Sequence, residues 1–262
     1  MARILAISSW VAAGHVGLSA AGPVFSLLGH ESIQLPTTLL SNHPGFGHVG
    51  GRATPPDQLR GMIEALAANR WLSEVDTVLT GYMPSAEHVG VALAALAHAP
   101  GARLVCDPIL GDAPKGLYVA QAAALAVASA LVPRADVLTP NLFELGWLSD
   151  SEIPDLAAAV GAARRLAPDA QVLLTSPPYP AGQTGVFEIS AAGTHAYRVP
   201  VRSGAPHGTG DVFAALTAAG VAPGSALGHL TSLVEASVGQ EHLAIISEAP
   251  RWRAAPPVQA AA

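Results

Sequence analysis

The fold class is decided by residues Thr77–Asp107, TVLTGYMPSAEHVGVALAALAHAPGARLVCD. Within this stretch, Thr77–Thr80 has the composition of a short buried strand, and Arg103–Cys106 has the same composition further along. The alanine-rich run between them, Ser85–Ala97, predicts a helix with Ser85 as its N-cap. Two strands joined by a helix form a parallel crossover unit, so these residues predict an α/β protein.

The same alternation continues on both sides of this unit. Further strands are predicted at Arg3–Ser8, Ser32–Leu35, Val137–Leu138 and Gln171–Leu174, with a hairpin at Gly185–Ile189 and His195–Val199. Further helices are predicted at His15–Leu28, Asp57–Asn69, Val119–Leu131, Leu156–Leu166, Asp211–Ala219 and Leu227–Val238. The rhythm predicts one domain over residues 1–262, with a doubly wound, mostly parallel central sheet and helices on both faces. We expect residues from about 250 to 262 to form a frayed tail.

The composition excludes several classes of protein. Half of the residues are hydrophobic, only 12% are charged, and the formal net charge is −6. Intrinsic disorder is excluded, and the negative charge argues against a nucleic-acid partner, whose phosphates favour a basic surface. The longest apolar run, about Ala120–Val132, is shorter than the roughly 18–20 residues that span a bilayer, so no membrane partner is expected. A single cysteine, Cys106, excludes an internal disulfide and fits the cytoplasm.

The sharpest chemical signal is Gly204-Ala205-Pro206-His207-Gly208-Thr209-Gly210-Asp211, which opens an apolar helix. Backbone N–H groups at a helix N-terminus favour an anion, and glycines let the chain turn those groups toward one point. Asp211, in the first turn, is either a plain N-terminal charge or a general base beside this anion site. The second interpretation suits phosphoryl transfer to an alcohol, in which the base takes the hydroxyl proton.

Polar residues follow most of the predicted strands. They are Ser9, Tyr82, Asp107, Asn141, Thr175 and Ser176. Taken alone, each of them is better explained as a turn residue at the end of a strand. The carboxyl ends of parallel strands meet at one edge of a sheet, where open α/β proteins bind their ligands. Together these residues therefore predict a ligand site at that edge.

Three carboxylates in two segments have the oxygen chemistry of a magnesium site. Asp107 and Asp112 straddle the turn after one strand, either as metal ligands or as surface loop acids. Glu144 follows Asn141 by three residues before an apolar run, a spacing that also predicts a helix capping box. The sequence has no His-Glu-x-x-His or Gly-x-Ser-x-Gly pattern, so neither a zinc site nor serine-hydrolase chemistry is expected.

The segment Ser41–Gly51, SNHPGFGHVGG, is rich in glycine. Its composition suits a lid that closes over a ligand, and it suits a plain surface loop equally well. We call this segment the flap.

Together these segments resemble the ribokinase-like superfamily and, within it, the pyridoxal kinase family. The resemblance runs from Ile4 to about Ala219 and is carried by Ile7-Ser8-Ser9-Trp10, Gly14-His15-Val16-Gly17, Ser41-Asn42-His43, Thr80-Gly81-Tyr82, Asp107-Pro108-Ile109-Leu110-Gly111-Asp112, Pro140-Asn141-x-x-Glu144, Val172-Leu173-Leu174-Thr175-Ser176 and Gly208-Thr209-Gly210-Asp211. The last of these is similar to the anion-hole and base motif of the whole superfamily. The flap, the Thr80-Gly81-Tyr82 turn and the segment Asp107–Asp112 narrow the resemblance to vitamin B6 kinases.

This resemblance implies ATP-dependent phosphorylation of the 5′-hydroxyl of pyridoxal, and of pyridoxine or pyridoxamine, with Mg²⁺ and a monovalent cation such as K⁺. It implies a ribokinase-like sheet with a small flap over the active site, in a homodimer. Asp211 would be the catalytic base, and Gly208, Thr209 and Gly210 would hold the phosphoryl oxygens. The other implied roles are Ser9, His43 and Tyr82 for the pyridoxal ring, Asp112, Asn141, Glu144, Thr175 and Ser176 for the nucleotide, and Asp107, Asp112 and Glu144 for magnesium, partly through water.

Two residues depart from the family pattern. Trp10 stands where the family often has histidine, and Pro44 stands where it often has threonine. Proline has no N–H and no hydroxyl, so a substrate hydrogen bond from that position is lost. Two alternatives therefore stay open. One is a hydroxymethylpyrimidine kinase with the same chemistry, and the other is a regulatory protein that binds vitamin B6 without turnover.

Overall fold

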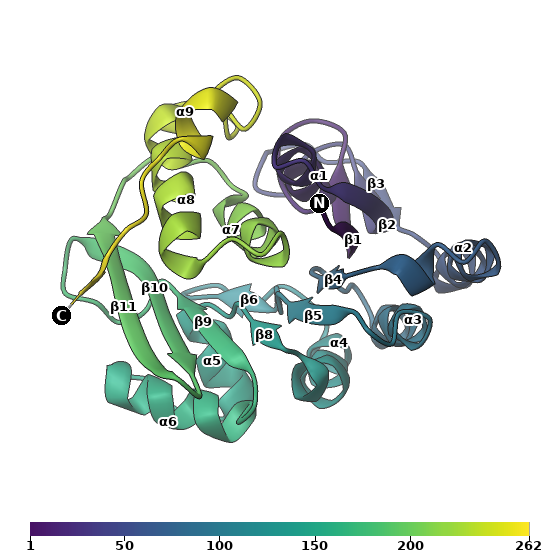
Figure 1. The fold of residues 1–262 in the computed structure, drawn as a ribbon, viewed down its shortest axis with the longest axis horizontal. Coiled ribbons are helices and arrows are strands. Elements are labelled where there is room, and N and C mark those ends of the chain that lie inside the picture. Colours follow the sequence, from purple (N-terminus) through teal and green to yellow (C-terminus); the bar gives the residue numbers. More distant parts are fainter. Residues whose placement is uncertain (262) are drawn as a thin grey trace.

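The computed structural model describes residues 1–261, which form one ten-stranded sheet between two layers of helices (Figure 1). The strands of this sheet are β1 (Arg3–Val11), β2 (Glu31–Leu40), β3 (Gly51–Ala53), β4 (Thr77–Thr80), β5 (Arg103–Cys106), β8 (Val137–Leu138), β9 (Gln171–Thr175), β10 (Gln183–Ser190), β11 (Gly193–Pro200) and β12 (Ala260–Ala261). A separate small ribbon pairs β6 (Gly111–Asp112) with β7 (Gly116–Leu117).

The helices lie on both faces of the sheet. They are α1 (Leu18–Leu27), α2 (Pro56–Ala68), α3 (Ala86–Ala97), α4 (Gln121–Ala126), α5 (Leu142–Ser149), α6 (Leu156–Leu166), α7 (Thr209–Ala218), α8 (Pro223–Ser237) and α9 (Ala249–Arg253). The longest of these, α8, has 15 residues. Within residues 1–261, no helix combines the length and the apolar character that crossing a bilayer requires.

The strand order is β12-β11-β10-β9-β8-β5-β4-β1-β2-β3. The central strands from β9 to β2 all run parallel, whereas β3 and the β10–β11 hairpin are antiparallel additions at the two edges. The predicted mostly parallel sheet is confirmed. The chain leaves β1 toward β2 on one side and later returns to β4 on the other side. A reversal of this kind opens a crevice at the carboxyl ends of the strands.

Each face of the sheet has its own hydrophobic core. Alternate residues of β1 point to opposite faces, so Leu5 and Ile7 enter one core while Ile4 and Ala6 enter the other. Helices α2 to α6 cover the first core, and α1, α7, α8 and α9 cover the second (Figure 1). The predicted double winding therefore follows from a central strand that is apolar on both sides.

The bounds of several predicted elements differ from the observed ones, and two of them are informative. The strand predicted at Ser32–Leu35 is part of the longer β2, which carries the chain out to the flap. The helix predicted at Val119–Leu131 is interrupted: α4 is followed by a π-helical turn over Val127–Leu131 and a 3₁₀ turn over Val132–Arg134. Pro133 lies in this last turn and has no N–H to continue an α-helical ladder, which explains the change of geometry.

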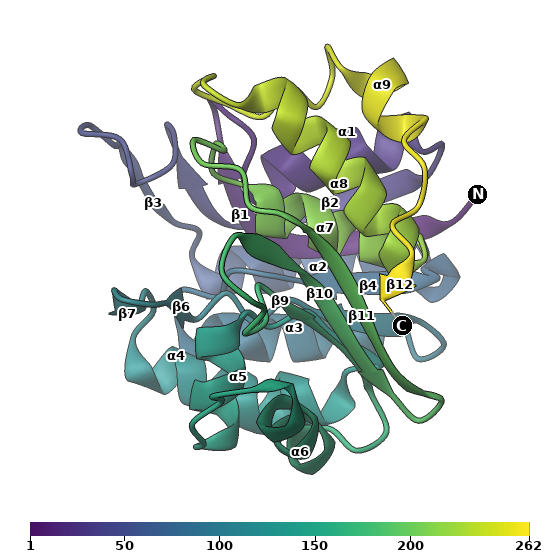
Figure 2. The ribbon, with the colours of Figure 1, turned by 90° about the vertical axis from the view of Figure 1, so that its left-hand side faces the viewer.

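The prediction of a frayed tail from about residue 250 is wrong for the described residues. Trp252 in α9 is only 1% exposed, and its Nε1–H donates to the carbonyl oxygen of Ile245 at 2.8 Å. The chain then runs along α8, and β12 pairs with the edge strand β11 (Figure 2). Gly228 makes room for this path, because a Cβ there would lie 2.1 Å from the carbonyl oxygen of Pro256. The tail is held by packing that composition does not reveal.

Candidate active site

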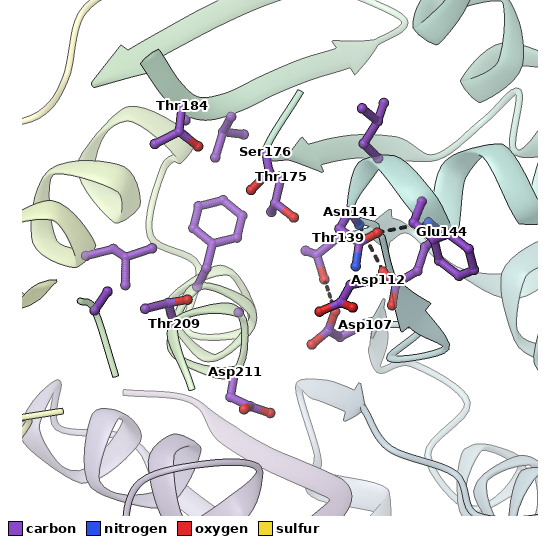
Figure 3. Close-up of a pocket in the computed structure, with 18 of the residues that line it drawn as sticks. Asp107, Asp112, Thr139, Asn141, Glu144, Thr175, Ser176, Thr184, Thr209 and Asp211 are labelled. Atoms are coloured by element: carbon purple, nitrogen blue, oxygen red, sulfur yellow. Dashed lines mark hydrogen bonds between the residues drawn. The ribbon is translucent and has the colours of Figure 1, made fainter. Parts of the chain in front are cut away.

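A cavity of about 1100 Å³ opens beside the carboxyl ends of β5, β8 and β9 and the start of α7 (Figure 3). All of the predicted site residues except Ser9 and Tyr82 line it. These are His43, Asp107, Asp112, Asn141, Glu144, Thr175, Ser176, Gly208, Thr209, Gly210 and Asp211. Figure 3 shows Asp211 on one side of the cavity and Asp107, Asp112, Asn141 and Glu144 on another. The crevice expected from the topology is therefore present and polar.

The start of α7 is fixed by a close backbone contact. Gly208 caps the helix with a left-handed φ of 103°, and a Cβ there would lie 2.0 Å from the carbonyl oxygen of His15. By contrast, a Cβ on Gly210 would have no heavy atom within 4 Å. The first N–H groups of an α-helix have no partner within the helix. Gly208 therefore sets the direction in which these donors face the cavity.

Asp211 lines the cavity from the first turn of α7 and is partly exposed. Burial raises the pKa of its carboxyl to about 6, while hydrogen bonds from the backbone N–H groups of Gly17 and of Asp211 itself act in the opposite direction. Gly17 also packs against Ser9, because a Cβ on Gly17 would lie 2.2 Å from the carbonyl oxygen of Ser9. The end of β1 is thus connected to Asp211 through one glycine.

On another side of the cavity, Glu144 is almost completely buried at 4% exposure. Its Oε2 accepts from the N–H of Asn141 at 2.9 Å and its Oε1 from the N–H of Leu110 at 2.8 Å. The Oδ1 of Asn141 accepts from the N–H of Glu144 at 2.9 Å, so the predicted capping box is confirmed. Burial raises the pKa of Glu144 to about 7, although its N–H partners oppose that shift. The Nδ2 of Asn141 donates to the carbonyl oxygen of Gly111 at 2.8 Å, which links α5 to the β6–β7 ribbon.

Asp107 lies directly after β5 and is buried. Its Oδ1 accepts a hydrogen bond from the Oγ1 of Thr139 at 3.0 Å. Burial raises the pKa of Asp107 well above its ordinary value, and the charges of Glu144 and Asp211 act in the same direction. Sequence reasoning gave Thr139 no role, although it follows β8 as the other polar residues follow their strands.

The three carboxylates do not form a ready-made metal centre. Within residues 1–261, no group of three or more His, Cys, Asp or Glu side chains could hold one metal ion. Each carboxylate oxygen of Glu144 accepts one backbone N–H, from Leu110 and from Asn141, and the magnesium role of Asp107, Asp112 and Glu144 stays a prediction. The Oδ1 of Asp112, however, is buried without a protein partner, so it is an acceptor for a bound water or a cation.

Ser9 and Tyr82, predicted to contact the substrate ring, lie outside the lining of this cavity. Tyr82 is joined to β1 and β2 by its backbone: its N–H donates to the Oγ of Ser8 at 3.1 Å, and its carbonyl accepts from the Oγ1 of Thr37 at 2.7 Å. Burial raises the pKa of the Tyr82 hydroxyl. Of the three residues assigned to the ring, only His43 of the flap lines the cavity.

The remaining wall comes from the β10–β11 side of the sheet. Thr175 is the last residue of β9 and Ser176 follows it, and Thr184 on β10 lies near them in Figure 3. Arg202, just after β11, also lines the cavity and donates to Glu235 at 2.7 Å. Sequence reasoning missed Thr184 and Arg202, because neither stands in a recognisable motif and the cavity is formed only when the hairpin joins the sheet.

Three comparisons with known proteins agree with this geometry. Residues 28–236 match a family described as phosphomethylpyrimidine kinase. The chain is 37% identical over 224 residues to the pyridoxal kinase PdxY of Leifsonia xyli subsp. xyli, covering 82% of this chain and 79% of that one. It is 36% identical over 233 residues to the pyridoxine/pyridoxal/pyridoxamine kinase of Bordetella avium, covering 86% and 79%. A pyridoxal kinase from Leishmania donovani, solved in complex with ADP and pyridoxine, matches with a TM-score of 0.89 and 31% identity over 98% of this chain and 97% of that one.

Proposed function

This chain belongs to the pyridoxal kinase family, and we propose that it transfers the γ-phosphoryl group of ATP to the 5′-hydroxyl of pyridoxal, giving pyridoxal 5′-phosphate and ADP. The observation that carries this function is Asp211 in the first turn of α7, facing a cavity beside the N–H groups that begin the helix. A base next to an anion site is what phosphoryl transfer to an alcohol requires. The relatives named above support a vitamin B6 ring as the acceptor.

Asp211 is the general base in this proposal. A pKa of about 6 leaves its carboxylate mostly ionised at neutral pH and still basic enough to accept a proton. The substrate oxygen attacks the γ-phosphorus, its proton passes to Asp211, and the bond from phosphorus to the leaving oxygen of ADP breaks. The N–H of Gly17 holds the carboxylate from the other side.

Gly208, Thr209 and Gly210 hold the oxygens of the transferred group through their backbone N–H groups. Charge builds on these oxygens during transfer, and donors that are already oriented stabilise it without reorganising. The contact between Gly208 and the carbonyl of His15 supports this role because it fixes the start of α7 before any ligand binds.

The nucleotide occupies the side of the cavity lined by Asn141, Thr175 and Ser176. Asp107, Asp112 and Glu144 are oxygen donors of the kind that Mg²⁺ prefers, and the free Oδ1 of Asp112 supports binding there through water. Such an ion neutralises phosphate charge when it is bound. A monovalent cation such as K⁺ beside the phosphates is also part of the proposal.

His43, Ser9 and Tyr82 contact the pyridoxal ring in this proposal. His43 lines the cavity, and Ser9 is linked to Asp211 through Gly17. Trp10, which follows Ser9, is 38% exposed and is therefore free to meet a ring from the solvent side. Pro44 contributes neither a hydroxyl nor an N–H, so substrate preference depends on the other flap contacts.

A second candidate is hydroxymethylpyrimidine kinase, and the description of the matching family favours it. The chemistry at Asp211 is the same for both alcohols, so only the ring separates the two functions. We place the protein in the cytoplasm as a homodimer. Exposed apolar side chains such as Trp71 at 52% and Leu39 at 43% support the homodimer. The buried free thiol of Cys106 supports the cytoplasm.

The test is release of ADP from ATP and Mg²⁺, measured with pyridoxal, pyridoxine, pyridoxamine and hydroxymethylpyrimidine side by side, with and without K⁺. We expect turnover with at least one B6 vitamer at a kcat/KM above that for the pyrimidine. Turnover with the pyrimidine alone would show that the substrate is hydroxymethylpyrimidine and would leave the proposed mechanism unchanged. Folded protein that binds pyridoxal 5′-phosphate but turns over none of the four would support the regulatory alternative instead.

A further inference from the structure

Two contacts between aromatic rings hold the tip of the flap against distant parts of the chain. The ring of His43 stacks on that of His207, with centroids 3.9 Å apart and planes at 25°. The ring of Phe46 meets that of His242 edge-on at 5.7 Å. His207 belongs to the loop that leads into α7, and His242 lies between α8 and α9. The flap is therefore docked onto the same loop that carries the proposed anion site.

The local geometry of the flap fits this docking. The N–H of Gly45 donates to the Nδ1 of His43 at 3.0 Å, so this nitrogen acts as an acceptor and is unprotonated. Pro44 between them has a fixed φ and restrains the turn. A Cβ on Gly45 would lie 2.9 Å from both the Nε2 of His207 and the Nδ1 of His43. A Cβ at position 45 would press on both rings, so glycine suits the stack as it stands.

We propose that His207 is a positioning residue for the flap: its ring stacks on His43 and holds that side chain at the edge of the substrate cavity. His43 lines the cavity, whereas His207 is outside the lining among residues 1–261, so His207 acts through His43. Because His43 is the flap residue assigned to the pyridoxal ring, this inference rests on the proposed function. Its structural part, a flap docked by a histidine pair, is testable without turnover.

The groups that face His43 make the docking sensitive to protonation. They are His207 from the loop before α7 and Lys115 from the turn between β6 and β7, and both are basic. Burial, followed by these two groups, lowers the pKa of His43 from the ordinary 6.5 to about 4. A base whose pKa is lowered in the docked state favours docking in its neutral form. The contribution of His43 to docking is therefore fully present above pH 6.5 and is lost as the pH falls toward 4.

The test is amide hydrogen exchange of the ligand-free chain at one neutral pH. For His207→Ala we expect the exchange rate of the flap amides, residues 41–51, to rise about twofold to tenfold. This is the factor that corresponds to the free energy of one aromatic pair. His207→Phe keeps a flat ring and should keep most of the protection. His98→Ala, which removes an exposed histidine after α3, is the matched control and should leave the flap unchanged. Equal flap exchange in wild type and His207→Ala, with both folded, would overturn the docking.

The second measurement is the KM for pyridoxal. His207→Ala should raise this KM about twofold to tenfold with little change in kcat, and His207→Phe should largely restore it. In the background His43→Ala, the further change His207→Ala should have no additional effect, because His207 acts through His43. Independent, additive effects would overturn the positioning role. Failure of the proposed function would show in the wild type as an absence of pyridoxal turnover, while hydrogen exchange would still decide the docking.

Discussion

The two sides of the cavity are built in different ways. On the side of β5, β8 and α7, the chemical groups are held by backbone hydrogen bonds and close packing, as Glu144 and Gly208 illustrate. On the flap side, the side chain of His43 is held by a stacked ring and by one hydrogen bond from the N–H of Gly45. The first side extends the buried parallel strands, whereas the second extends the edge of the sheet at β2 and β3.

This difference separates the reaction from the choice of substrate. A group anchored to the backbone at several points is hard to move, and so the base and the anion site stay preorganised. A flap with partly exposed residues, such as Val49 at 49% exposure, adapts more easily to a different ring. Substitutions on the first side should therefore affect kcat or stability, while substitutions on the flap should affect KM.

The largest effect is expected for Asp211→Asn. Removing a general base should lower kcat about 10²–10⁴-fold, while the isosteric amide leaves folding intact. Steady-state kinetics and thermal unfolding of the purified variant check both halves of this expectation. A variant that turns over as fast as wild type would show that the base is another group.

Next in size is the contrast between two glycines of the same motif. Gly208→Ala forces a methyl group against the carbonyl of His15 in a left-handed conformation, and overpacking of this kind costs about 1–3 kcal/mol of stability. Gly210→Ala meets no neighbouring atom and should change stability by no more than about 1 kcal/mol. Urea unfolding of the two variants measures the difference. Equal stabilities would mean that the start of α7 is not fixed by His15.

The pH dependence of kcat/KM should report the base. Protonated Asp211 cannot accept a proton, so the rate should fall on the acid side with a midpoint near 6, by about tenfold per pH unit below it. Glu144 and His43 also titrate, with pKa values of about 7 and about 4. The pH profile of the residual kcat/KM of Asp211→Asn should therefore lack the acid limb with a midpoint near 6. If that limb persisted in the variant, it would belong to another residue.

The smallest effect is expected on the flap. Pro44→Thr restores a hydroxyl and an N–H beside His43, and one added hydrogen bond should lower the KM for pyridoxal about twofold to tenfold. We expect kcat to stay within about twofold, because the proposal assigns the flap to the substrate ring and not to the transferred group. A large change in kcat, measured beside wild type under saturating ATP, would contradict the separation of the two sides.

The sequence predicted those features whose cause is local. The capping box of Asn141 and Glu144 depends on a spacing of three residues, and it is present. Alternating apolar runs likewise predicted the strands β4 and β5 at the positions where they occur. Asp211 was singled out because it directly follows a glycine-flanked turn, and the structure has it at the start of α7 facing the cavity.

Features that depend on contacts between distant segments could not be predicted. The hydrogen bond from Thr139 to Asp107 joins two strand ends, and the stack of His43 on His207 joins segments far apart in the sequence. Composition suggested a frayed tail, but the burial of Trp252 of α9 against α8 depends on contacts between distant segments. The spacing of Asn141 and Glu144 predicted the capping box, but it could not predict that the other carboxylate oxygen of Glu144 accepts from the N–H of Leu110, 34 residues earlier.

The most direct test of this account follows the phosphoryl group itself. Wild-type protein is incubated with ATP labelled in the γ-phosphoryl group, Mg²⁺ and pyridoxal, and the products are separated and identified. The account predicts that the label moves to the 5′-oxygen of pyridoxal, and that Asp211→Asn forms this product far more slowly. Label that remains in ATP, or appears only as inorganic phosphate, would contradict it.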